Sequence, residues 1–179
     1  MEVLLIDVVD SATRSRMMSG IKSKNTLPEI RIRKALHARG FRYRIHVPNI
    51  PGKPDIVLPK YNSLIMVHGC FWHGHSCRYF KVPKSRTQFW LDKIGKNQAR
   101  DQVQLSALTD TKWKVLIVWE CAIREMRKEK DHDIIDQIER WILQGADAPS
   151  GDHRSPVTEI SAAESPGLGV GSIRNCTVN

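Results

Sequence analysis

The sequence lacks the features that mark membrane and secreted proteins. None of its apolar runs approaches the roughly 18 residues that a bilayer-spanning helix needs. The first eleven residues contain three acids and no base, so they do not form the basic start of a secretory signal peptide. Only four cysteines occur in 179 residues, and without a secretory signal they argue against a disulfide scaffold. We therefore expect a cytoplasmic protein.

Acidic residues are also few relative to basic ones. Lys and Arg total 28 against 19 Asp and Glu, which gives a formal net charge of +9. The positive excess lies in residues 1–145, because 146–179 contains more acids than bases. A charge of this sign favours polyanionic partners, of which nucleic acid is the commonest.

The hydrophobic patterning predicts one α/β domain over residues 1–145. A helix is expected from Ser11, and a capping box from Thr26 to Glu29 begins a second one, which ends before Gly40. Alternating or continuous apolar runs predict strands. The further elements expected are strands 41–46, 55–59, 63–68 and 113–120, and helices 87–108, interrupted at Gly95, and 131–143. This order predicts a three-layer fold in which a mixed central sheet is flanked by helices.

Residues 146–179 differ in composition from the rest of the chain. They are rich in Ala, Ser, Pro and Gly and show no hydrophobic period. Such a composition is typical of segments that do not form a core. We expect a flexible C-terminal tail.

Cysteine and histidine cluster in the segment that follows strand 63–68. Cys70, His75 and Cys77 lie within eight residues, and Cys121 directly follows the predicted central strand. Three thiolates and an imidazole suit tetrahedral zinc, and a site with four protein ligands would be structural. The alternative is that Cys121 is an ordinary buried thiol and the histidines lie on the surface.

Carboxylate and imidazole groups are expected at the ends of the neighbouring strands. Asp55 begins one strand and His68 ends the next, with His73 and Glu29 nearby. A carboxylate there can bind Mg²⁺, and an imidazole can act as a base in phosphodiester hydrolysis. The alternatives are that Asp55 only caps a turn and that Glu29 only completes the capping box.

Aromatic and basic residues alternate between positions 71 and 90. Basic groups bind phosphates, and exposed rings can enter the base stack of a duplex. We expect Phe80 and Phe89 to lie in the core, whereas Phe71 and Trp72 are difficult to bury in a polar loop. The residues predicted to contact DNA are Phe71, Trp72, Trp90, Lys81 and Arg86.

Two segments carry a resemblance to a known family. These are PGKPDIVLPKYNSLIMVHGCFWHGHSCRYFKVPKSRTQFWLDKIGKN and the later WKVLIVWEC. They closely resemble the very short patch repair (Vsr) endonucleases, and the match spans about residues 11–145. The resemblance implies a restriction-endonuclease-like fold with a zinc-stabilised loop. It also implies an enzyme that nicks one DNA strand beside the T of a T:G mismatch left by deamination of 5-methylcytosine.

The resemblance further implies a role for each motif residue. Asp55 would be the principal Mg²⁺ ligand, His73 the general base, and His68 and Glu29 would assist. Val67 stands where the family often has threonine, so it would offer its backbone carbonyl to the Mg²⁺ ion. The implied zinc ligands are Cys70, His75, Cys77 and Cys121, and the implied aromatic wedge is Phe71, Trp72 and Trp90.

The implied partner is double-stranded DNA that contains a T:G mismatch, bound by a monomer that cooperates with mismatch-repair proteins. Two other functions fit the same residues. One is a sequence-specific restriction endonuclease that cuts both strands of intact DNA. The other is a zinc-stabilised mismatch-binding protein without catalysis.

Overall fold

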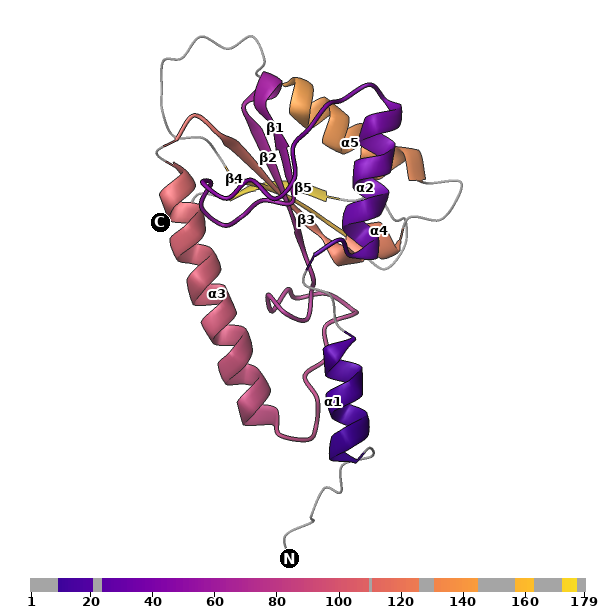
Figure 1. Ribbon diagram of the computed structural model, residues 1–179, viewed down its shortest axis with the longest axis vertical. Helices are drawn as coiled ribbons and strands as arrows, with labels where there is room; N and C mark the ends of the chain where they lie inside the picture. The colour runs from indigo at the N-terminus through magenta and orange to yellow at the C-terminus, as the bar shows by residue number, and fades with distance from the viewer. Residues whose placement is uncertain are drawn as a thin grey trace, which may run out of the picture.

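The computed structural model describes residues 10–20, 24–109, 111–125, 131–144, 157–162 and 172–176. A five-stranded mixed sheet forms its centre (Figure 1). The spatial order of the strands follows the chain: β1 (Ile56–Leu58), β2 (Ser63–His68), β3 (Lys114–Trp119), β4 (Val157–Ser161) and β5 (Ser172–Cys176). The pairs β2–β3 and β3–β4 are parallel, whereas β1–β2 and β4–β5 are antiparallel.

Strand β3 is the central strand that the sequence predicts. Its residues from Val115 to Trp119 are all buried, because β2 and β4 flank it and helices cover both faces. Side chains that alternate along β3 enter two separate apolar clusters. Leu116 and Val118 face one cluster, whereas Val115, Ile117 and Trp119 face the other. The run of apolar residues thus reflects burial on both faces.

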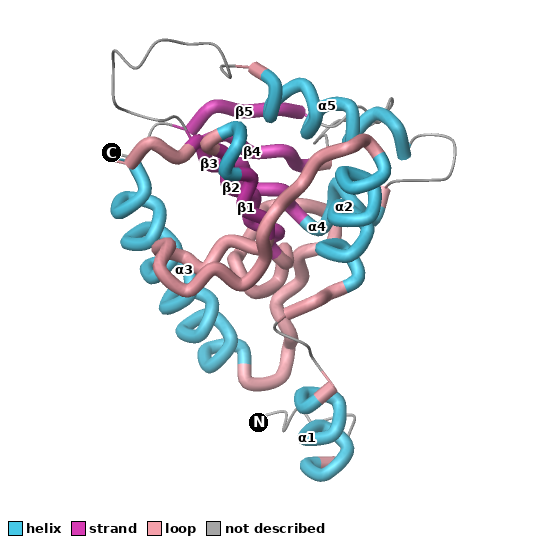
Figure 2. The backbone as a smooth tube through the Cα atoms, turned by 45° about the horizontal axis from the view of Figure 1, so that its top comes forward, coloured by secondary structure: helices cyan, strands magenta, loops and turns pink. Residues whose placement is uncertain are grey.

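Helices lie on both sides of the sheet, which confirms the three-layer prediction. Figure 2 shows helices α2 (Leu27–Ala38), α4 (Glu120–Arg124) and α5 (Asp131–Leu143) on one face and α3 (Thr87–Thr109) on the other. Helix α1 (Ser11–Ser19) lies apart from the sheet in both views. Helix α3 continues through Gly95 without the expected interruption. Among the described residues, no helix combines the length and apolar character that a membrane span requires.

Strands β1 and β2 form an antiparallel hairpin. A 3-10 turn, Pro59–Tyr61, joins the strands, and Asn62 follows it in the left-handed region with φ 46°. Register pairs Ile56 with Ile65. This pairing brings the start of β1 beside the end of β2, where the candidate active-site residues lie.

The prediction of a strand over residues 41–46 is wrong. Only Arg44 pairs there, through an isolated bridge in which it exchanges hydrogen bonds of 2.8 and 2.9 Å with Val57. His46 adopts a left-handed φ of 54°, which ends the extended run. Strand β1 has three residues, so it offers little length for a longer ladder.

The flexible tail predicted over 146–179 is also wrong for the residues that the structure describes there. Strand β4 pairs in parallel with β3 over four residue pairs, and β5 pairs with β4. Val157 and Ile160 are buried against the two apolar clusters. An edge of β3 left unpaired would expose backbone donors and acceptors, and this short segment satisfies them.

Lys114, at the start of β3, binds the C-terminal end of α5. Its ammonium group donates hydrogen bonds to the carbonyls of Trp141 at 3.0 Å, Ile142 at 3.1 Å and Gln144 at 2.5 Å. It also lies 4.7 Å from the centre of the Trp141 ring. Carbonyls in the last turn of a helix have no partner within the helix, so a cation there is favourable.

Replacement of Lys114 by Met should lower the free energy of unfolding by about 1–2 kcal/mol, because the carbonyls lose a charged donor while the apolar stem is kept. Urea denaturation measures the change. The matched control is Lys112→Met, which alters an exposed lysine two residues earlier. Equal stability of the two variants would contradict the capping role.

Candidate active site and metal centre

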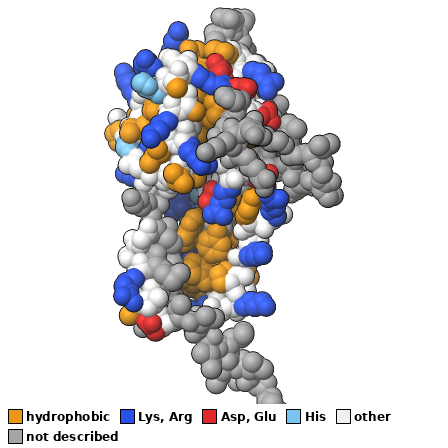
Figure 3. Space-filling view, turned by 90° about the vertical axis from the view of Figure 1, so that its right-hand side faces the viewer, with side chains coloured by type: hydrophobic (Ala, Val, Ile, Leu, Met, Phe, Trp, Pro, Cys, Tyr) orange, Lys and Arg blue, Asp and Glu red, His pale blue; other side chains and the backbone are white. Residues whose placement is uncertain are grey.

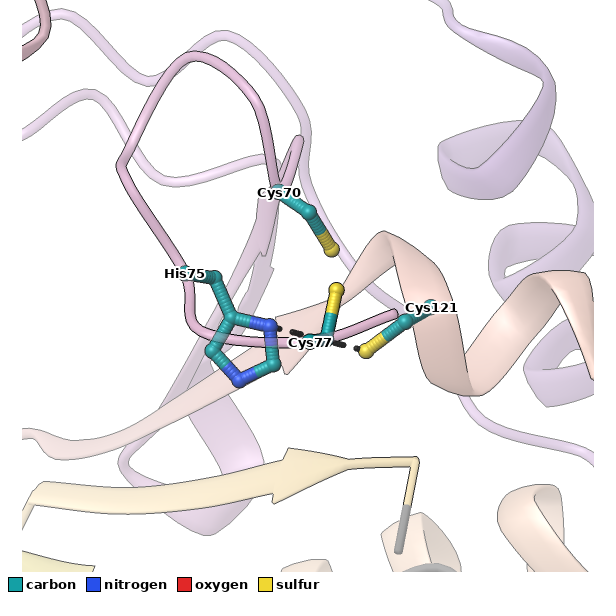
Figure 4. A group of neighbouring side chains, drawn as sticks. All are labelled: Cys70, His75, Cys77 and Cys121. Atoms are coloured by element: carbon teal, nitrogen blue, oxygen red, sulfur yellow. Dashed lines mark hydrogen bonds between the residues drawn. The ribbon is translucent and has the colours of Figure 1, made fainter. Parts of the chain in front are cut away.

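Three cysteines and one histidine converge at the end of β3. The ligand atoms of Cys70, His75, Cys77 and Cys121 all lie within 4.8 Å of one another. Figure 4 shows the sulfur atoms and the imidazole pointing toward a common centre. Cys121 comes from α4 and the others come from the loop after β2, so the prediction that Cys121 meets this loop in space is confirmed.

Short-range hydrogen bonds fold the loop around the cluster. The His75 N–H donates to the Cys70 carbonyl at 3.0 Å, and the Phe80 N–H donates to the Cys77 carbonyl at 2.9 Å. Gly74 between them has φ 64°, and a Cβ there would lie 2.5 Å from Nε2 of Gln98. The left-handed φ and the crowding by Gln98 both favour glycine at this position.

The donor set suits a structural zinc ion. Cys70 and Cys121 are buried, and Sγ of Cys121 lies 3.6 Å from Nδ1 of His75. Hydrogen bonding from the Cys70 thiol lowers the pKa of Cys121, with further lowering by His75. A thiol with a lowered pKa loses its proton more readily, and the thiolate is the form that would bind zinc.

Asp55 directly precedes β1 and lies beside the end of β2, as predicted. Its N–H donates to the Ile65 carbonyl at 3.1 Å, and its Oδ2 accepts a hydrogen bond of 2.7 Å from the Val67 N–H. Burial raises the pKa of Asp55 to about 6, with a further contribution from the negative charge of Glu29. A cation would offset both effects, so these oxygen donors fit a hard ion such as Mg²⁺.

His68 and His73 are stacked, with ring centroids 3.9 Å apart and an interplanar angle of 7°. Nδ1 of His73 lies 2.5 Å from Oδ2 of Asp101 on α3. With Nδ1 protonated toward this carboxylate, Nε2 of His73 carries the lone pair. Burial lowers the pKa of His68 to about 3, with a smaller contribution from His73, which keeps the His68 ring neutral.

Asp101 joins the candidate site and was not predicted from the sequence. It lies on the same face of α3 as Asn97, whose amide donates to the Trp72 carbonyl at 2.9 Å. The i, i+4 spacing of these two polar residues was the available signal. It did not indicate which loop the polar face would meet.

Glu29 both caps the start of α2 and lies in the candidate active site. It accepts hydrogen bonds from the backbone of Asn25 at 2.9 Å and Thr26 at 3.2 Å, in the manner of a capping residue. It is also buried, pairs with Arg33 at 2.8 Å and lines the same cavity as Asp55. Arg33, another residue missed from sequence, donates to the Asp55 carbonyl at 3.1 Å and so ties α2 to the strand start.

Three aromatic rings lie beside these groups. Phe71 contacts Trp72 with a centroid distance of 5.1 Å and Trp90 at 5.4 Å, both nearly edge-on. Phe89 is 43% exposed and Phe80 is half-buried, so the prediction that both belong to the core is wrong. Lys81 and Arg86 are exposed in the same segment. Figure 3 shows hydrophobic side chains gathered between basic groups on one face.

A cavity of about 860 Å³ joins the candidate catalytic groups. Asp55, His68, His73 and Asp101 line it, and Trp72 links it to the aromatic rings. The basic side chains on its wall are Lys24, His46, Lys53 and Arg100. The cavity therefore combines acid–base groups with positive charge, an arrangement that suits a polyanionic substrate.

The mixed sheet with helices on both faces and a Cys/His cluster places this chain in the restriction-endonuclease-like class of folds. The family model for DNA mismatch endonuclease Vsr matches residues 6–79. DNA mismatch endonuclease Vsr of Escherichia coli strain K12 is 46% identical over 145 residues, which cover 80% of this chain and 93% of that protein.

Two type II nicking enzymes are similar as well. V.XorIIP of Xanthomonas oryzae is 43% identical over 122 residues, covering 68% of this chain and 90% of that protein. V.NmeAIP of Neisseria meningitidis is 47% identical over 120 residues, covering 67% of this chain and 86% of that protein. The chain belongs to the Vsr DNA mismatch endonuclease family, and it is a nicking DNA endonuclease.

Loss of one sulfur ligand should weaken zinc binding by the Cys/His cluster. In Cys121→Ser we expect less than one zinc ion per chain and a fall in stability of about 3 kcal/mol or more, which lowers Tm by roughly 6–12 °C. Zinc is counted by elemental analysis and Tm is read by circular dichroism. Ala107→Ser is the control because it adds a hydroxyl at an exposed position of α3. Full zinc content in Cys121→Ser would exclude Cys121 as a ligand.

Asp55→Asn should stabilise the metal-free protein at pH 8. The folded-state pKa of Asp55, about 6, lies above its unfolded value of 3.8, so ionised Asp55 opposes folding above pH 6. The free energy of unfolding of the variant should exceed that of the wild type by roughly 1–3 kcal/mol at pH 8. This difference should vanish as the pH falls from 6 to 4.

Urea denaturation in EDTA at several pH values measures the effect of Asp55→Asn. Asp92→Asn, on the exposed side of α3, is the matched control. A difference that stays constant from pH 8 to pH 4 would show that burial of the Asp55 charge is not its cause.

Proposed function

We propose that the protein nicks one strand of duplex DNA beside the T of a T:G mismatch, as the first step of short-patch repair. The position of Trp72 carries the proposal. This ring lines the cavity that holds Asp55 and His73, and it contacts Phe71 and Trp90. An aromatic group that enters the base stack would therefore lie next to the groups that cut the backbone.

The roles of the acid–base residues follow from their contacts. His73, oriented by Asp101, accepts the proton of the attacking water at Nε2. His68 remains neutral beside it because burial has lowered its pKa. Glu29 and Arg33 hold the backbone that carries Asp55.

Asp55 and the backbone carbonyl of Val67 are the proposed Mg²⁺ ligands. When bound, the ion neutralises negative charge that develops on the cleaved phosphate. Because Val67 would contribute only its carbonyl, a hydroxyl at this position is not needed. The hydrogen bond from the Val67 N–H to Asp55 keeps the two groups adjacent.

The proposed DNA contacts are made by aromatic side chains and by basic side chains. Phe71, Trp72 and Trp90 form the wedge at the mismatch, and Lys81 and Arg86 bind phosphates. One active site per chain suits a monomer that cuts a single strand. We further propose that the repair step involves the mismatch-repair proteins of the same cell.

A nicking assay on end-labelled duplexes tests the proposal. The duplexes differ only in one T:G or C:G pair and are incubated with Mg²⁺ or EDTA. We expect one nick beside the T, only with the mismatch and Mg²⁺. Asp55→Ala should reduce the rate by about 1,000-fold or more, and His73→Ala by about 100- to 10,000-fold, because each removes a group that stabilises the transition state.

His37→Ala, which alters an exposed histidine on α2, is the control and should keep the wild-type rate. Cleavage of both strands in the fully paired duplex would favour a restriction endonuclease. Equal nicking of the T:G and C:G duplexes would exclude mismatch recognition.

A further inference from the structure

Trp119 connects the metal centre to the candidate active site. It ends β3 and is buried. Its ring stacks on His75, with centroids 4.2 Å apart and an interplanar angle of 11°. The same ring meets His68 edge-on at 5.4 Å and His73 at 6.4 Å. The orientation of this indole therefore affects one residue of the Cys/His cluster and both histidines of the cavity.

Strand β4 supplies the hydrogen bond that orients the indole. The Trp119 Nε1–H donates to Oε2 of Glu159 at 3.0 Å. Parallel pairing sets Glu159 opposite Ile117, which lies on the same face of β3 as Trp119. Just beyond β4, the Ala162 N–H donates to Sγ of Cys121 at 3.4 Å. Two contacts thus run from this segment to the residues around the metal centre.

The bond to Glu159 has a clear physical consequence. A buried indole N–H needs a hydrogen-bond acceptor. Without one, rotation of the ring toward another acceptor lowers the free energy. Stacking on His75 depends on the plane of the ring, so rotation would disturb the imidazole that faces the cluster. Residues that contact a metal-binding side chain commonly determine both the orientation of that side chain and the affinity of the site for the metal.

We propose that Glu159 is a positioning residue for both sites. Its carboxylate fixes the Trp119 ring, and the ring in turn holds His75 toward the metal and His68 and His73 toward the cavity. The part of this inference that concerns catalysis rests on the nicking activity proposed above. The part that concerns the metal centre does not.

The test compares two substitutions at Glu159 in the zinc-loaded full chain. Glu159→Met keeps the length of the side chain and lacks an acceptor, whereas Glu159→Gln retains an oxygen acceptor. Ser161→Ala, two residues along the same face of β4, is the matched control. Zinc release to a chromogenic chelator is timed, and kcat and KM are measured for nicking of the T:G duplex.

In Glu159→Met we expect zinc release to be about 10-fold faster and kcat to be about 10-fold lower. KM should stay within about 2-fold of the wild type, because Glu159 is not proposed to touch DNA. Glu159→Gln and Ser161→Ala should release zinc and nick DNA as the wild type does. Unchanged zinc release in Glu159→Met, or an equally large effect in Glu159→Gln, would overturn the proposal.

Trp119→Phe provides a second route if Glu159→Met does not fold. This variant keeps an aromatic ring and lacks the N–H donor, so it should also release zinc faster. Adding Glu159→Ala, which removes the acceptor, should have no further effect in Trp119→Phe, whereas an additional loss would overturn the proposal. If the wild type fails to nick the T:G duplex, the proposed function fails while the zinc-release result still decides the role of Glu159.

Discussion

The structure depends on the convergence of three cysteines and one histidine, a donor set that suits zinc, at the end of β3. The segment between β2 and α3 contains no helix or strand, yet it carries Phe71, Trp72 and His73. Ordering each residue of such a segment costs about 1–2 kcal/mol of backbone entropy. Cys70, His75 and Cys77 join it to Cys121, which begins a helix directly after the central strand. A zinc ion there would link the loop that holds the functional groups to the most buried strand of the sheet.

The acidic groups that line the cavity beside this centre lower the folding stability of the protein. Asp55 is a carboxylate largely removed from water and close to a second acid, Glu29. Arg33 offsets part of that charge and also binds the Asp55 carbonyl. Strongly perturbed groups in a cleft are typical of functional sites. The histidine pair shows the same principle, because burial keeps His68 neutral while Asp101 orients His73.

Contacts between segments distant in the chain assemble both sites. Helix α3 crosses the outer side of the sheet and brings Asp101 and Asn97 to the loop after β2. Strand β4, from a segment of low hydrophobic content, orients Trp119 and contacts Cys121. The metal centre and the acid–base groups therefore form one connected unit around the Trp119 ring.

Local patterns in the sequence determined several elements of this protein. The capping residues around Thr26, the apolar runs of β2 and β3, the apolar stripe of α5 and the Cys70–His75–Cys77 spacing each act over a few residues, so the sequence alone predicts them. Tertiary structure alone decided that residues 41–46 form only a bridge, that β4 and β5 extend the sheet, and that Asp101 and Arg33 reach the cavity. The reason is physical: a strand or a charged side chain is stabilised by a partner distant in the chain, and local spacing does not specify that partner.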